Sequence, residues 1–399
     1  MKLEKRKDED MDLSKSKFGN SRYTFWGESI PGEDIYSRLS IIYDQYGDKF
    51  LTKKIRYYFD EWDADTGIDQ QIHEHYHWMI LNPPVSDMII WPKDLIIMGP
   101  ETTLCTTATV VNNYQVYATD AARDSSNYGL VFADRDYHSL KSLKKVIQEL
   151  KRRPLTSNAL SYCNPDIIKI VYGIILCIAE LNDSGYYFYD FSFDRFLVDS
   201  RNNVYLDFSN LIFHESELKK LQRGWIHLEE PREFPLDFVE PWLFRQDQEI
   251  QEKVVYVNEQ SMQQVKAPVA DEITQNFGLC AMVFYLLYGI YAYDGKLHEK
   301  TDMDTPEGYY DFMRSQIENP IFIFDPEDTR NSLGVLDYDI YYQELWNKSP
   351  QQLKDVFINI LRRENAERTN QNIKTLKPRE LLKLLTDINL NNYRDRDKQ

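Results

Sequence analysis

Residues 185–213, GYYFYDFSFDRFLVDSRNNVYLDFSNLIF, decide how the rest of this chain is interpreted. They contain two aspartates, Asp190 and Asp207, before and after two short apolar runs. The runs are made of strand-forming residues, and the asparagine pair between them is a signal for a tight turn. In chain order these parts are Phe196–Val198, Asn202-Asn203 and Val204–Leu206. The stretch therefore predicts the end of a helix, a loop with Asp190, a β-hairpin and a loop with Asp207.

The composition is that of a folded protein with a large acidic excess. A chain of 399 residues is long enough for two domains or for one two-lobed unit. Apolar residues make up 42 % of it, so we expect a packed core. The 64 acidic residues outnumber the 47 basic ones and give a formal charge of −17. This excess argues against a nucleic-acid or anionic-membrane binder, because basic patches hold such partners, but it allows a local basic pocket for a phosphate.

The cysteines and the apolar runs indicate a soluble protein of the reducing cytoplasm. The four cysteines form no CxxC pair, so no zinc site is expected, and three of them lie in apolar runs where a buried thiol is expected. They are Cys105, Cys163, Cys177 and Cys280. The first residues are charged and lack the apolar core of a secretory signal. The longest apolar run, residues 277–290, is too short to span a bilayer and predicts a buried core helix.

Along the chain, strand-like runs give way to helical ones. Short aromatic and β-branched runs predict three strands between residues 23 and 58, then a helix at 69–81. Strands at 88–91 and 95–98, a hairpin at 104–118 and a strand at 128–133 are expected to follow. Helical runs follow at 140–151, 165–183, 271–290, 308–317, 351–361 and 378–390. This order predicts an α+β fold. The predicted parts are a disordered leader at 1–19, a β-rich lobe at 20–134, a helical lobe at 135–390 with a mobile loop at about 246–264, and a polar tail at 391–399.

The order of loop, hairpin and loop around the two aspartates resembles that of protein kinases. In these enzymes one Asp accepts the proton of the substrate hydroxyl, and the Asp of an Asp-Phe-Gly motif holds Mg²⁺. Here the second motif is Asp207-Phe208-Ser209. The resemblance implies a two-lobed protein-kinase-like fold, with Asp190 as the catalytic base and Asp207 as the ligand of Mg²⁺.

The same resemblance implies an ATP site in the β-rich part, since a kinase must position the triphosphate and neutralise its charge. Lys54 is the candidate for contacting the phosphates, and Glu74 in the next helix is the candidate for bracing Lys54. Gly27 and Gly32 lie in the candidate phosphate loop, although the acidic residues after Gly32 would repel a triphosphate if they faced it. Each residue also has a plain interpretation, as a solvated side chain or as part of an ordinary hairpin.

A narrower resemblance comes from the C-terminal half. Residues 319–326, NPIFIFDP, precede a Trp-containing stretch at 338–346, and the prolines at 83–84 precede Ile90-Trp91-Pro92. These features resemble a bacterial group of kinase-like proteins whose kinase domains occur alone or attached to helix-hairpin-helix segments. The match extends over roughly residues 22–385, and NPIFIFDP is its most specific string.

Several positions depart from the kinase pattern. Phe188-Tyr189 replaces the His-Arg before the catalytic Asp, which removes the docking site for an activation-loop phosphate. Arg195 replaces an Asn that binds a second Mg²⁺; a cation cannot ligate a metal, but it could contact a phosphate of the nucleotide. Gln275 stands where an Asp anchors the catalytic loop. Glu240 is a candidate partner for Arg368, similar to a pair that braces kinase C-lobes.

A competing motif overlaps the helix of Glu74. Residues 73–77, HEHYH, match the H-E-x-x-H pattern of zinc proteases, with His73 and His77 on one helix face. A catalytic zinc needs a third protein ligand, and the sequence nearby offers none. A solvated helix, or one that carries the kinase glutamate, is therefore the favoured interpretation.

Three hypotheses follow from the residues and the resemblance. The chain is a Ser/Thr protein kinase that uses ATP and Mg²⁺, or a pseudokinase that binds nucleotide or a protein partner with little or no catalysis. The third hypothesis is a kinase-fold transferase for a small molecule, since a fold alone does not fix the chemistry. The expected partners are a nucleotide and a protein substrate or protein partner, with no nucleic acid and no membrane.

Overall fold

The computed structural model describes the greater part of the chain. The described residues are 13–15, 22–31, 38–44, 46–55, 76–97, 128–133, 139–154, 160–209, 212–216, 238–241, 271–297, 306–334, 337–362 and 375–396. Most of the leader, the predicted hairpin at 104–118 and the loop at 246–264 lie outside them. The chain divides into two units. The first comprises Met1–Pro84, Ile90–Ser139 and Leu228–Arg232, and the second comprises Val85–Ile89, Leu140–His227 and Glu233–Gln399.

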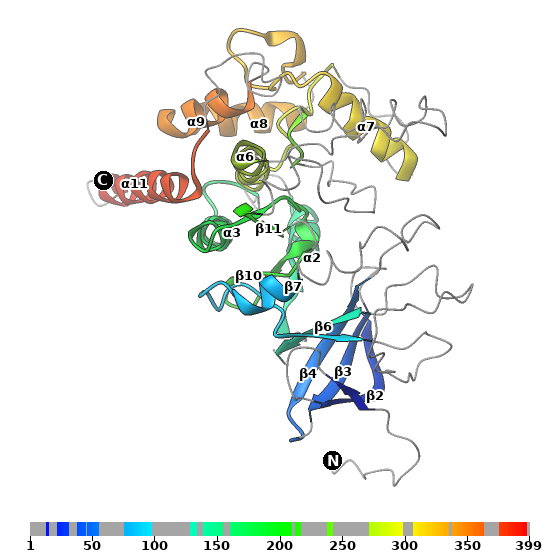
Figure 1. Ribbon diagram of the computed structural model, residues 1–399. Helices are drawn as coiled ribbons and strands as arrows, with labels where there is room; N and C mark the ends of the chain where they lie inside the picture. Colours follow the sequence, from blue (N-terminus) through cyan, green and yellow to red (C-terminus); the bar gives the residue numbers. More distant parts are fainter. Residues whose placement is uncertain are drawn as a thin grey trace. The chain divides into compact units, whose positions relative to one another are not determined.

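The first unit is built on an antiparallel sheet in the order β1-β2-β3-β4-β6-β5 (Figure 1). Its strands are β1 (Leu13–Lys15), β2 (Arg22–Pro31), β3 (Arg38–Asp44), β4 (Lys49–Ile55), β5 (Asp94–Ile97) and β6 (Tyr128–Ala133). Leu51 and Leu130 are each 1 % exposed, and they lie on neighbouring strands, as expected for a β-branched and leucine-rich sheet core. Residues 76–81 are helical, which agrees with the helix predicted at 69–81.

The second unit is mainly helical. Its helices are α2 (Leu143–Lys151), α3 (Pro165–Asp183), α6 (Glu272–Tyr288), α7 (Pro306–Glu318), α8 (Asp337–Lys348), α9 (Gln351–Leu361) and α11 (Pro378–Arg396). The α+β fold class, with a smaller sheet-containing part before a larger helical part, is confirmed. Two local expectations differ: α8 was not predicted as a helix, and the strand expected at 88–91 is only a single bridge between Ile89 and Leu206.

Helix α6 is the core of the second unit. Asp271 caps its first turn through the backbone N–H groups of Ile273 and Thr274, and Gly289 ends it with a φ of 76°, a left-handed conformation that glycine adopts without strain. Every residue from Thr274 to Tyr288 is buried, and α3, α8 and α9 pack against the helix. The core helix predicted at 271–290 is thus confirmed. Within the described residues, no helix is long and apolar enough to cross a membrane.

The string NPIFIFDP is part of this core. The Phe324 ring stacks on Trp346 of α8, with centroids 4.4 Å apart and an angle of 7° between the planes. Phe322 packs edge-on against Phe284 of α6. Asn331, in a short 3-10 turn, donates to the carbonyl of Ile321 at 2.7 Å. The string and the Trp-containing stretch that follows it are therefore joined by direct aromatic packing.

The cysteines are expected to differ sharply in reactivity. Cys163 is exposed, whereas Cys177 in α3 and Cys280 in α6 are buried. Burial raises the pKa of the Cys177 thiol to about 12, so this thiol stays neutral and unreactive at mildly alkaline pH. Iodoacetamide should alkylate Cys163 in the native protein and spare Cys177 and Cys280, as measured by peptide mass spectrometry. A denatured sample is the control. If Cys177 were alkylated as fast as Cys163 in the native protein, the described packing would be contradicted.

Candidate functional site

The predicted hairpin lies between the two aspartates, with the strand bounds that the sequence indicated. Strand β8 (Tyr186–Phe188) precedes Asp190, a 3-10 turn η4 (Phe193–Arg195) follows it, and the hairpin is β9 (Phe196–Val198) and β10 (Val204–Leu206). Strand β7 (Lys141–Ser142) pairs with β9, and β11 (Ile212–His214) pairs with β8.

Local hydrogen bonds close the turn of the hairpin. Asn202 has a φ of 61°, which asparagine tolerates better than most residues. The carboxylate of Asp199 accepts from the backbone N–H groups of Arg201 and Asn203, both at 2.8 Å. Burial raises the pKa of Asp199, but the hydrogen bonds from Asn203 and Arg201 and the charge of Lys169 outweigh it, and the net pKa is lowered. The tight turn predicted from the asparagine pair is present.

The hairpin is held against helix α3 by close packing. A Cβ atom on Gly173 of α3 would lie only 2.7 Å from the Cβ of Val204, so the absence of a side chain lets the helix and β10 approach. At the turn, Lys169 Nζ donates to the carbonyl of Arg201, and Asn202 Nδ2 donates to Asp166 Oδ1 at 2.9 Å. The loops on both sides of the hairpin therefore start from a fixed base.

The carboxylate of Asp190 is buried and engaged by three side chains. Asp190 is 6 % exposed. Its Oδ2 accepts from Arg195 Nε at 2.5 Å and from Ser209 Oγ at 2.6 Å, and its Oδ1 accepts from Ser192 Oγ at 3.1 Å. The guanidinium of Arg195 therefore neutralises the charge of the predicted catalytic base, and two hydroxyls occupy further acceptor positions.

Arg195 also connects this loop to Asp207. Its backbone carbonyl accepts from the N–H of Asp207 at 2.8 Å. Asp207 is half-buried, and its Oδ1 accepts from the N–H of Phe208 at 3.0 Å, while the Phe208 ring is 1 % exposed. Arg195 thus links the two predicted aspartate loops, with its side chain on Asp190 and its main chain on Asp207, in addition to the hydrogen bond from Ser209 to Asp190.

Gln275 anchors the backbone that leads into the Asp190 loop. This side chain, in the first turn of α6, is completely buried, and its Oε1 accepts from the N–H of Phe188 at 2.8 Å. Its Nε2 lies 2.9 Å from the side-chain oxygen of Asn182 when that amide is oriented to satisfy both of its polar atoms. An amide therefore supplies the acceptor at a position where the kinase pattern has an Asp.

A helix glycine makes room for the residue after Asp190. A Cβ atom on Gly278 would lie 2.5 Å from the ring of Phe191, which is 3 % exposed. Phe191 also packs edge-on against Phe188, with centroids 5.1 Å apart. Any side chain at Gly278 would push Phe191, and with it the Asp190 loop, away from α6.

The structure brings together three of the seven predicted site residues, Asp190, Arg195 and Asp207, all in the second unit. Lys54 and Gly27 belong to the first unit. The backbone of Lys54 pairs with Gly129, and Gly27 lies where the register of β2 and β3 shifts between Phe25 and Ser29. Glu74 and Gly32 lie outside the described residues. His73 and His75 of the H-E-x-x-H motif and Arg368, the predicted partner of Glu240, lie outside them as well.

The donor set suits a metal ion that arrives with a nucleotide rather than a resident one. Among the described residues, no group of three or more His, Cys, Asp or Glu side chains is placed to hold a metal. Asp190 accepts from a guanidinium, and Asp207 is the carboxylate of the second predicted loop. Mg²⁺ is commonly bound by one or two carboxylates together with substrate phosphates, so Asp207 fits one Mg²⁺ shared with a nucleotide.

Ser209 and Ser192 are site residues that the sequence did not reveal. Serine is common in loops, and nothing in the spacing of either residue to Asp190 distinguishes it from a solvated side chain. Ser209 is 3 % exposed, and its contact with Asp190 joins residues 19 positions apart, so only the folded loops define it.

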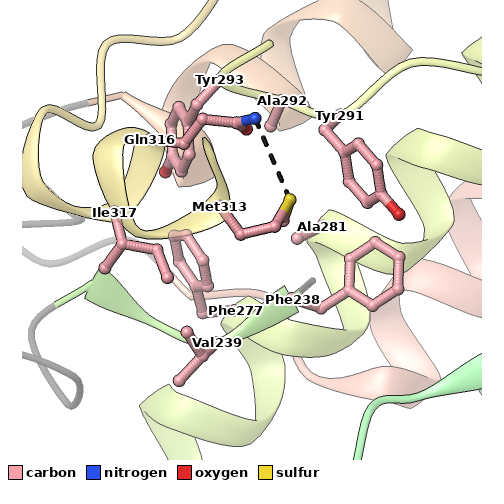
Figure 2. A pocket seen from close by; sticks show the side chains of 10 residues that line it. All are labelled: Phe238, Val239, Phe277, Ala281, Tyr291, Ala292, Tyr293, Met313, Gln316 and Ile317. Carbon is pink, nitrogen blue, oxygen red and sulfur yellow. Dashed lines mark hydrogen bonds between the residues drawn. The ribbon is translucent and has the colours of Figure 1, made fainter. Parts of the chain in front are cut away.

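A separate apolar hollow of about 350 Å³, including its open mouth, lies in the second unit (Figure 2). It is lined by side chains of α6, α7, residues 238–239 and residues 291–293. Figure 2 shows Gln316 among these apolar side chains, with its Nε2 4.0 Å from the Met313 sulfur. None of the three clustered site residues lines it.

No family model matches the chain, and no curated protein matches it. Solved structures do match at low identity. ROP2 from Toxoplasma gondii, described as a virulence factor with a protein-kinase fold and no enzymatic activity, has 12 % identity, a TM-score of 0.46, and coverage of 96 % of this chain and 86 % of its own. The Toxoplasma gondii specific rhoptry antigen kinase domain has 12 % identity and a TM-score of 0.43, with coverage of 85 % and 87 %. The ROP18 kinase domain in complex with AMP-PNP and sucrose has 11 % identity and a TM-score of 0.41, with coverage of 85 % and 84 %.

Proposed function

We propose that this chain is a kinase-like protein that binds a Mg²⁺–nucleotide complex and transfers phosphate weakly or not at all, a pseudokinase. The order of Asp190, hairpin and Asp207 supports the kinase-like assignment. The observation that carries the choice of a pseudokinase is the engagement of Asp190 by Arg195 and Ser209.

A catalytic base must present a free acceptor to the proton that it removes. At Asp190 one carboxylate oxygen already accepts from a guanidinium and a hydroxyl, and the other accepts from Ser192. A substrate hydroxyl would have to share Oδ1 with Ser192 or displace a donor from Oδ2, and a charge-assisted hydrogen bond contributes about 1.5–3 kcal/mol. Protonation of Asp190 would also weaken its ion pair with the Arg195 guanidinium, whose side chain is 23 % exposed.

Nucleotide binding in this proposal uses residues other than Asp190, so it does not require a free catalytic base. Asp207 would hold Mg²⁺, while the phosphate contacts of Lys54 and Gly27 stay predictions from the sequence. Bound Mg²⁺ would supply neutralisation of the phosphate charge. The Asp207 backbone is fixed by its hydrogen bond to Arg195, so its carboxylate starts from a defined position.

An active Ser/Thr protein kinase is the second candidate. One observation favours it: Gln275 fixes the main chain before Asp190 by accepting a hydrogen bond from the N–H of Phe188. The narrower resemblance to the bacterial kinase-like group rests on the NPIFIFDP string and remains a prediction.

The test is a thermal-shift titration with ATP, with and without Mg²⁺, together with an assay of γ-phosphate transfer. We expect a Mg²⁺-dependent rise in Tm that is lost in Asp207→Asn, since a ligand that binds only the folded state stabilises it. We expect no transfer above background. Asp199→Asn, on the hairpin turn, is the control for loss of a nearby carboxylate. Transfer that is efficient in the wild type and lost in Asp190→Asn would favour the kinase; no Tm shift under any condition would exclude nucleotide binding.

A further inference from the structure

We propose that the exposed basic face of α2 binds an acidic segment of a partner protein. The α2 basic strip consists of the exposed side chains of Lys144, Lys145 and Lys151 on the helix and of Arg152 and Arg153 directly after it. The inference goes beyond the proposed function, because binding at the strip requires neither a nucleotide nor phosphoryl transfer.

The strip is positively charged, whereas the chain as a whole is strongly negative. Residues 141–153, KSLKKVIQELKRR, contain Lys or Arg at 141, 144, 145, 151, 152 and 153, and Glu149 is their only acidic residue. The whole chain has a formal charge of −17. A basic segment in so acidic a protein attracts anions at one place while the rest of the surface repels them.

Helix geometry puts these cations on the solvent side. Leu143, Ile147 and Leu150 are the buried residues of α2, spaced at intervals that share one helix face. Successive residues rotate by about 100°, so Lys145 and Arg152 point away from that face. The helix packs against β7, β9 and η4, all within the second unit.

Two cations of the strip are left available for a partner. Lys144 forms an ion pair with Asp194 at 3.0 Å, and the flanking Lys141 forms one with Glu149 at 3.0 Å. Arg152 and Arg153 are exposed, and neither guanidinium has an ion pair or hydrogen bond within the described part of the chain. Arginine forks bind carboxylates in a bidentate manner, so this pair suits an acidic side chain.

The strip ends beside the candidate site. Asp194, the partner of Lys144, is the neighbour of Arg195, which holds Asp190. A helix of this length is about 14 Å long, which matches a short peptide segment. A nucleic acid or an anionic membrane is long enough to extend past the strip, and the net charge of −17 on the chain opposes such extended anions more than a short acidic segment. An acidic peptide is therefore the partner that the charges favour.

The test is fluorescence anisotropy with a fluorescein-labelled peptide rich in Asp and Glu, alongside the same peptide with Asn and Gln. The variant is Arg152→Ala with Arg153→Ala, which breaks no ion pair of the described residues. The matched control is Arg314→Ala with Lys348→Ala, exposed cations of α7 and α8 whose loss changes the net charge equally. We expect the strip variant to bind the acidic peptide about fivefold more weakly, the control to bind as the wild type does, and added salt to weaken binding.

Three results would overturn the proposal: no preference for the acidic peptide, equal weakening in both variants, or stronger Arg152- and Arg153-dependent binding to single-stranded RNA or phosphatidylserine vesicles. The ATP thermal shift of the strip variant should equal that of the wild type. If the strip variant loses peptide binding but keeps the ATP thermal shift, the strip and the nucleotide site are independent. Absence of the shift in both proteins would count against the proposed function alone.

Discussion

Replacing Arg195 by asparagine and Ser209 by glycine in one variant is expected to raise transfer of the γ-phosphate of ATP to casein by about 10- to 100-fold. Both substitutions install the residues that the kinase pattern has at these positions, and both remove a donor from Asp190 Oδ2. Each charge-assisted hydrogen bond contributes about 1.5–3 kcal/mol, and each 1.36 kcal/mol removed from a barrier is tenfold in rate. The asparagine also supplies an oxygen that a guanidinium lacks.

The matched control for this variant is Arg201→Asn with Ser200→Gly. These residues have the same chemistry and are exposed on the turn of the same hairpin, away from Asp190. The control should transfer phosphate as the wild type does, and Asp207→Asn in the activated background should abolish the gain. A wild-type rate equal to or above that of the Arg195 and Ser209 variant would show that the Asp190 contacts do not suppress catalysis.

Replacing Asn331 by alanine is expected to lower the free energy of unfolding of the second unit by about 3–5 kcal/mol. Asn331 is completely buried. Its Nδ2 donates to the carbonyls of Tyr293 and Ile321 at 2.9 and 2.7 Å, and its Oδ1 accepts from the N–H of Leu297 at 3.0 Å. The Tyr293 carbonyl keeps its hydrogen bond from the N–H of Gly295, but the substitution leaves the Ile321 carbonyl and the Leu297 N–H without their Asn331 partner. Each unsatisfied buried group costs about 1–3 kcal/mol.

Urea unfolding followed by tryptophan fluorescence measures this effect, because Trp346 stacks on Phe324 in the same core. Asn347→Ala is the control, since Asn347 is exposed on α8 and its loss should cost less than about 0.5 kcal/mol. Similar unfolding midpoints for the two variants would mean that Asn331 does not fasten this segment to the core.

The sequence by itself determined the local structure around the two aspartates. Strand-forming runs on both sides of an asparagine pair predicted β9, the turn and β10, because tight turns and short strands depend mainly on neighbouring residues. The continuous apolar run at 277–290 predicted α6 as a core helix for the same kind of reason. Helix α8 escaped prediction because its sequence, DYDIYYQELWNK, mixes apolar and polar side chains without a clear face, and packing of Leu345 and Trp346 fixes it instead.

Only the tertiary structure decided what surrounds Asp190. The sequence placed Arg195 near the predicted base and anticipated a contact with phosphate, but the side-chain torsions that aim its guanidinium at Asp190 depend on the folded loop. Ser209 reaches Asp190 from the far side of the hairpin, Gln275 reaches Phe188 across 87 positions, and Gly278 accommodates Phe191 from another helix. Such contacts join residues that are distant in the chain, so their geometry is set by packing and not by local sequence pattern.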